Sequence, residues 1–110
     1  MGLGKHFTDA LITTKSTEEA FDIAKDAIMQ VSKCKIKVAE FNNGHFFIHS
    51  SEKVNWLSTN WPTIIKIHSE TLNEETIIAV EVYSNGTSIT QSGNTKKKLS
   101  LLVDILRREL

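Results

Sequence analysis

Three consecutive lysines follow a glycine and an asparagine in the segment S-G-N-T-K-K-K, residues 92–98. Asn94 is a favourable N-cap residue, so the segment predicts a turn with a helix beginning directly after it. Free amides at a helix N-terminus attract anions, and Lys96, Lys97 and Lys98 would strengthen that attraction. The spacing differs from the phosphate-binding motif Gly-x-x-x-x-Gly-Lys-Ser/Thr. Two interpretations stay open: a solvated helix end, or a weak patch for an anion, a nucleic acid or an acidic partner.

The remaining reactive residue types are sparse. His45 and His49 share one face of a predicted strand, but their Cα atoms would lie about 13 Å apart, too far for two ligands of one zinc ion. Cys34 is the only cysteine, and it follows the partially negative end of a predicted helix, which disfavours a reactive thiolate. No nucleophile motif and no converging pair of carboxylates stands out. The sequence therefore predicts a protein that is not an enzyme and that holds no metal or cofactor.

Trp56 lies within the longest expected loop, residues 51–60, and Trp61 directly follows it. Aromatic side chains on such a loop can close a cleft that binds a small apolar or anionic ligand between a sheet and its helices. They can also plug the open end of a two-layer core. Both interpretations stay open.

The elements that would position these residues follow from hydrophobic spacing. Ser16 and Glu19 form a capping box at the start of an amphipathic helix over residues 16–33. Apolar residues then alternate with polar ones, with hairpin signals at Asn43-Gly44 and Asn85-Gly86. A last amphipathic helix is predicted over residues 95–110. The strands are expected at 6–14, around 35–40, 45–50, 64–68 and 77–83, and at 87–92.

This β-α-β-β-β-β-β-α order predicts an α+β two-layer sandwich, in which an antiparallel sheet of five to six strands carries two helices on one face. The other face would hold Phe47, Ile64, Ile77 and Tyr83 among polar side chains. These residues are either scattered surface apolar groups or a contiguous interface for self-association or a protein partner.

Composition limits the function classes further. The 110 residues fit one domain, residues 1–110, and 13 basic residues balance 13 acidic ones, which argues against nucleic-acid binding. No signal peptide or membrane-spanning stretch is visible, so a cytoplasmic protein without a membrane partner is expected. The charge is uneven, because residues 94–110 hold five basic and two acidic residues, a local excess of +3.

The second half, roughly residues 44–110, resembles a group of small uncharacterised bacterial domains. The matching pieces are Trp61, Gly86-Thr87, Gly93-Asn94 and the lysines 96–98. The resemblance implies a curved antiparallel sheet with two helices on one side, similar to TATA-box-binding-protein-like and helix-grip folds. It implies no activity.

The sequence thus favours a non-enzymatic binding or interaction module that self-associates through the outer sheet face or an edge strand. The alternative is a small-ligand domain with a cleft near Trp56 and Trp61. A weak nucleic-acid contact through Lys96–Lys98 comes third.

Overall fold

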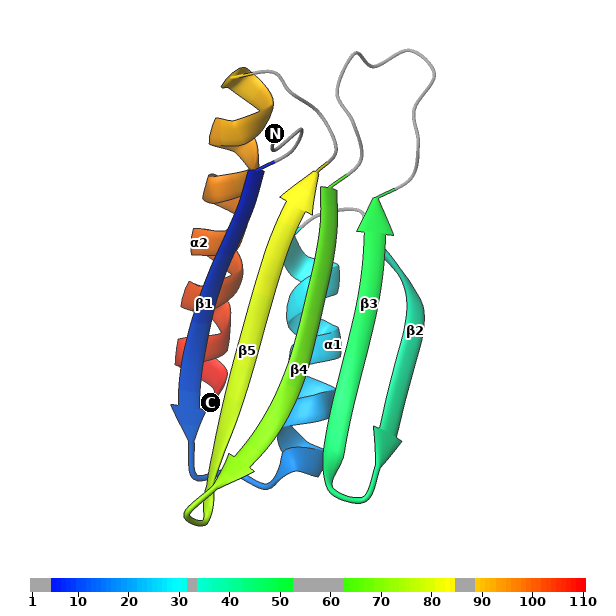
Figure 1. Ribbon diagram of the computed structural model, residues 1–110, viewed down its shortest axis with the longest axis vertical. Coiled ribbons are helices and arrows are strands. Elements are labelled where there is room, and N and C mark those ends of the chain that lie inside the picture. Colours follow the sequence, from blue (N-terminus) through cyan, green and yellow to red (C-terminus); the bar gives the residue numbers. More distant parts are fainter. Residues whose placement is uncertain (1–4, 32–33, 53–62, 85–88) are drawn as a thin grey trace.

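The computed structural model describes residues 5–31, 34–52, 63–84 and 89–110. Within these ranges the elements are β1 (Lys5–Thr13), α1 (Thr17–Val31), β2 (Cys34–Asn42), β3 (His45–Glu52), β4 (Thr63–Leu72), β5 (Glu75–Ser84) and α2 (Ile89–Glu109). The strands form one antiparallel sheet in the order β1-β5-β4-β3-β2, and both helices lie on the same face of it (Figure 1). The predicted α+β two-layer sandwich is confirmed.

Helix α1 begins as its capping residues predict. The Glu19 amide donates to Ser16 Oγ at 3.2 Å, and the Ser16 hydroxyl donates to Glu19 Oε1 at 3.4 Å. The buried face of α1 consists largely of alanines, with Ala20, Ala24 and Ala27 almost fully covered. Small side chains let the helix lie close to the sheet, where it contacts β2, β3 and β4.

Both hairpin turns in the described residues use positive backbone φ angles. Asn43 and Gly44 have φ of 54° and 78°, as expected for the type I′ turn that Asn-Gly favours. Asn73 and Glu74 join β4 to β5 with φ of 52° and 68°. Glu74 therefore holds a conformation that glycine would adopt more easily.

The inner face of the sheet and the two helices enclose the core. The alternation predicted for the strands is confirmed, since the apolar members of one set are buried and point toward the helices. The apolar side of the last predicted helix, which includes Leu102, is buried too. The core residues in the described ranges include Leu11, Phe46, Ile48, Ile65, Ile67, Ile78, Val80, Val82, Leu99, Leu102, Val103 and Leu106.

Helix α2 begins at Ile89, earlier than predicted. Residues 89–92, expected to be part of a strand, form its first turn, and Asn94 lies inside the helix instead of capping it. The turn signal of Gly93-Asn94 is local and costs a helix only about 1 kcal/mol per residue. The packing of α2 against β1, β5 and α1 outweighs it.

Strand β2 contains a bulge that the alternation did not predict. Ile36 pairs with Ser50 and Val38 pairs with His49, so Lys37 is the extra residue. A bulge reverses the facing of every later residue in the strand. In an uninterrupted strand Val38 would share the face of Ile36, but here it lies on the opposite face and is 38% exposed.

Candidate functional site

The face of the sheet that points away from the helices, here called the outer face, carries rows of side chains set by the strand register. One central row runs Phe47, His68, Ala79, Ala10 across β3, β4, β5 and β1. The neighbouring row contains His49, Lys66, Glu81 and Thr8 in the same strand order.

The four apolar residues proposed as an interface all lie on this outer face. Ile64 pairs directly with Tyr83 at one end of the sheet, while Ile77 pairs with Ile12 near the other end. Phe47 lies between them on β3 and is 37% exposed, and Ile12 is 66% exposed. The structure thus brings large apolar side chains to one face, with the Lys66–Glu81 row passing among them.

Polar contacts on the outer face order several of these side chains. The Lys66 ammonium lies 5.4 Å from the centroid of the Tyr83 ring, within the range of a cation–π contact. The rings of Phe47 and His49 meet edge to face, with 6.5 Å between centroids. His68 Nε2 lies 3.8 Å from Glu70 Oε1.

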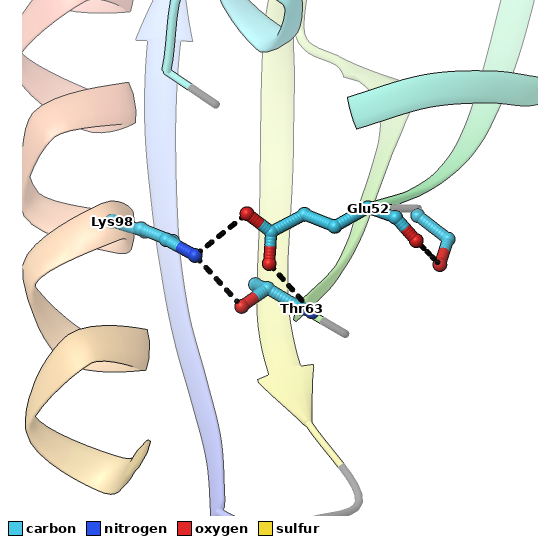
Figure 2. A network of polar contacts seen from close by, with 4 residues as sticks. Glu52, Thr63 and Lys98 are labelled. Carbon is cyan, nitrogen blue, oxygen red and sulfur yellow. Dashed lines mark hydrogen bonds and ion pairs between the residues drawn. The ribbon is translucent and has the colours of Figure 1, made fainter. Parts of the chain in front are cut away.

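A second candidate site lies where the inner face of the sheet meets α2 (Figure 2). Lys98 Nζ donates to Glu52 Oε2 at 2.8 Å and to Thr63 Oγ1 at 3.1 Å. The Thr63 amide donates to Glu52 Oε1 at 2.9 Å. This network joins the end of β3, the start of β4 and the middle of α2. It is partly shielded, because the side chains of Lys98 and Glu52 are 25% and 20% exposed and Thr63 is buried.

The surroundings of Glu52 favour its charged form. Burial alone would raise the pKa of this carboxyl. The hydrogen bonds from Lys98 and Thr63 and the nearby ammonium charge outweigh burial, so the pKa lies below the ordinary value of 4.5. Glu52 and Lys98 therefore form an ion pair at neutral pH.

The structure separates the three lysines that the sequence grouped with Asn94. Lys96 and Lys97 are exposed on α2, while Lys98 turns toward the sheet and pairs with Glu52. They lie beyond the first turn of the helix, so free amides do not accompany them. The anion patch and the nucleic-acid contact stay predictions, now without the helix N-terminus that motivated them.

Trp56 and Trp61, and the turn at Asn85-Gly86, lie outside the described residues. Among the residues that are described, no three His, Cys, Asp or Glu side chains gather as a metal site. Neither helix in the described ranges combines the length and apolar character that crossing a membrane requires.

Comparison with known proteins identifies the fold but no sequence family. No family model matches this sequence, and no curated protein is similar to it. A protein from Nitrosospira multiformis is similar in structure, with a TM-score of 0.61 at 11% identity over 96% of this chain and 95% of that one. A member of the major latex protein family from Arabidopsis thaliana has a TM-score of 0.56 at 7% identity. The match covers 96% of this chain and 91% of that protein. CalU16 from Micromonospora echinospora has a TM-score of 0.54 at 11% identity. The match covers 96% of this chain and 76% of that protein.

These neighbours place the chain among small α+β folds of the helix-grip type, in which a curved antiparallel sheet holds a long C-terminal helix. The sequence resemblance implied either a helix-grip fold or a TATA-box-binding-protein-like fold. The structural neighbours support the helix-grip fold and are only loosely consistent with the TATA-box-binding-protein-like one. Glu52 and Thr63 were not among the predicted site residues. No local pattern marks them, because Glu52 and Lys98 are 46 positions apart in the chain.

Proposed function

We propose that this chain is a non-enzymatic interaction module that self-associates through the outer face of its sheet. The exposure of large apolar side chains on that face carries the proposal, above all Ile12 at 66% and Phe47 at 37%. Ile64, Ile77 and Tyr83 are half-buried beside them. Exposure of several large apolar side chains on one face is typical of a surface that a protein partner covers.

The outer face is favoured over the edge strand β2 as the contact surface. The β2 edge carries a bulge at Lys37 and the exposed charges of Lys35 and Lys37. Bulges and edge lysines are the devices by which sheets prevent pairing with another strand.

Sedimentation velocity across a concentration series tests the proposal. The wild type is expected to sediment as a dimer that dissociates on dilution. Phe47→Lys should weaken the dimer by about tenfold or more, since it sets a charge in the apolar contact. Leu101→Lys is the matched control, because Leu101 is 46% exposed on α2, away from the outer face. A wild type that stays monomeric at millimolar concentration contradicts the proposal.

One observation favours a second function, the binding of a small apolar anion between the sheet and the helices. The ammonium of Lys98 contacts Glu52 at the end of β3, and Trp56 and Trp61 belong to the sequence that directly follows this strand. A carboxylate could compete with Glu52 for that ammonium.

Tryptophan fluorescence during titration with dodecanoate tests this second function. A saturable change is expected, and Lys98→Met should weaken it by about tenfold while Lys97→Met leaves it unchanged. A flat signal in the wild type would rule out binding of this probe near Trp56 and Trp61.

A further inference from the structure

The central row of the outer face has large side chains on one half and small ones on the other. Phe47 and His68 stand on β3 and β4, while Ala79 and Ala10 stand on β5 and β1. The line between β4 and β5 divides the row into these halves. Because Phe47 and Ala10 are both exposed, the row presents a ridge on one side of that line and a hollow on the other.

The neighbouring row divides its charges at the same line. Lys66 on β4 and Glu81 on β5 are directly paired across it. These two rows therefore have unlike halves, one with a ridge and a positive charge and the other with small side chains and a negative charge. Outside these rows, Glu70 and Glu40 also lie on the half that carries Lys66.

A two-fold axis lying in the interface and parallel to the strands, between β4 and β5, exchanges these halves. The rotation places β4 of one copy over β5 of the other, and β3 over β1. Phe47 then faces Ala10 of the second copy, and Lys66 faces Glu81 of the second copy, each twice because the contact is isologous. Ile64 likewise faces Tyr83 of the second copy.

We infer that two copies of this chain pack outer face to outer face about this axis, with Lys66 and Glu81 of each copy forming reciprocal ion pairs. The inference rests on the proposed self-association and specifies its partner and geometry. Opposed charges and complementary bulk select this arrangement from other stackings of the same two faces.

An axis across the strands is disfavoured by the same residues. Passing through the row of Lys66 and Glu81, it would set Lys66 against Lys66 and Glu81 against Glu81. Like charges brought together in an interface cost affinity, which disfavours an axis at this row.

The overlapping strands cover an area near the lower end of what a stable dimer buries. In this geometry β1, β5, β4 and β3 of the two copies overlap, while β2 has no strand opposite it. Four strands about 4.8 Å apart and about 30 Å long cover on the order of 600 Å². A standard interface buries about 800 Å² on each partner. Near the β4–β5 hairpin the same rotation sets Glu70 against Ile77 of the second copy, at the edge of the contact.

The first test uses the double variant K66E/E81K, which keeps opposite charges paired within each chain and is therefore expected to fold like the wild type. Each protein should form homodimers. Mixed dimers of wild type with K66E/E81K would oppose lysine to lysine and glutamate to glutamate, so they should be disfavoured by about tenfold or more. Fluorescence-detected sedimentation of labelled wild type with excess unlabelled variant measures this.

The second test mixes the single variants K66E and E81K. Alone, each presents two like charges to its own copy and should dimerise about tenfold more weakly than the wild type, whereas the mixture should form heterodimers. Lys97→Glu, on the exposed face of α2, is the control and should dimerise normally. Circular dichroism of each variant verifies its fold.

The outcomes separate the inference from the proposal on which it rests. If the wild type dimerises but mixes freely with K66E/E81K, self-association stands and this geometry is wrong. If the wild type is monomeric throughout, both are wrong.

Discussion

At the scale of single residues, Glu52, Thr63 and Lys98 link the sheet to α2 through an ion pair and hydrogen bonds. The ion pair is neither fully exposed nor fully buried. An exposed pair contributes less than about 1 kcal/mol, while breaking a buried pair costs about 3–5 kcal/mol. Its value to stability should lie between these limits.

Lys98→Met should destabilise the fold by about 1–2 kcal/mol, because it leaves the Glu52 carboxylate partly shielded without its cation. Urea denaturation measures the change. Lys97→Met removes a lysine that is exposed on the same helix and should change stability by less than about 0.5 kcal/mol. Equal effects of the two substitutions would show that the network does not stabilise the fold.

The lowered pKa of Glu52 predicts a specific loss of stability in acid. A carboxyl with a folded pKa below 4.5 contributes stability that is fully present above the unfolded value and disappears as pH falls through the folded pKa. Glu52→Gln does not titrate at this position. The stability advantage of the wild type over Glu52→Gln should therefore shrink below about pH 4.5, as followed by urea denaturation across pH. An advantage that does not change with pH would mean that Glu52 titrates alike in both states.

At the scale of elements, local signals predicted the centres of the helices and strands better than their ends. The capping box at Ser16 sets the start of α1, because its hydrogen bonds are made within four residues. The start of α2 was wrong, since a glycine and an asparagine that are typical of a turn lie in its interior. A few unfavourable helix residues do not interrupt a helix that tertiary packing holds.

Gly93→Ala should stabilise the protein by about 0.5–1 kcal/mol, because Gly93 lies inside α2 and alanine is the better helix former. Thermal and urea denaturation measure the gain. Gly44→Ala is the matched control, because Gly44 has a φ of 78° and should lose about 1–2 kcal/mol. If Gly93→Ala were destabilising as well, a turn at Gly93 would be the better description.

The β4–β5 hairpin offers a gain of the same kind. Glu74 has a φ of 68° in a turn whose second position favours glycine, so Glu74→Gly should stabilise the fold by about 0.5–1 kcal/mol. Glu75→Gly, one residue later in β5, should instead weaken the strand. Urea denaturation of both variants distinguishes the turn from the strand, and a loss on Glu74→Gly would refute the turn assignment.

At the scale of the whole molecule, β1 and α2 depend on contacts between distant parts of the chain. Strand β1 pairs with β5 at the far edge of the sheet from β2, and α2 packs over both β1 and β5 (Figure 1). The order β1-β5-β4-β3-β2 makes every strand antiparallel to its neighbours. One face of this sheet is closed by the two helices, and neither of them covers the outer face (Figure 1).

Leu102→Ala should destabilise the fold by about 2–5 kcal/mol, because Leu102 is fully buried where α2 closes the core. Leu101→Ala, its exposed neighbour on the same helix, should change stability by less than about 0.5 kcal/mol. Chemical denaturation compares the two. Similar losses would place α2 in a different rotation against the sheet.

The amino-acid sequence by itself determined the two-layer class, the face of each helix that is buried and the side of the sheet on which Phe47, Ile64, Ile77 and Tyr83 lie. These features depend on periods of 3.6 and 2 residues, which are local. Only the tertiary structure decided the strand order, the bulge at Lys37 and the length of α2. It also decided which of the lysines of α2 are exposed and which one forms an ion pair. Lys96 and Lys97 stay in solvent, while Lys98 binds Glu52, because folding brings a carboxylate 46 positions away to within 2.8 Å of its ammonium.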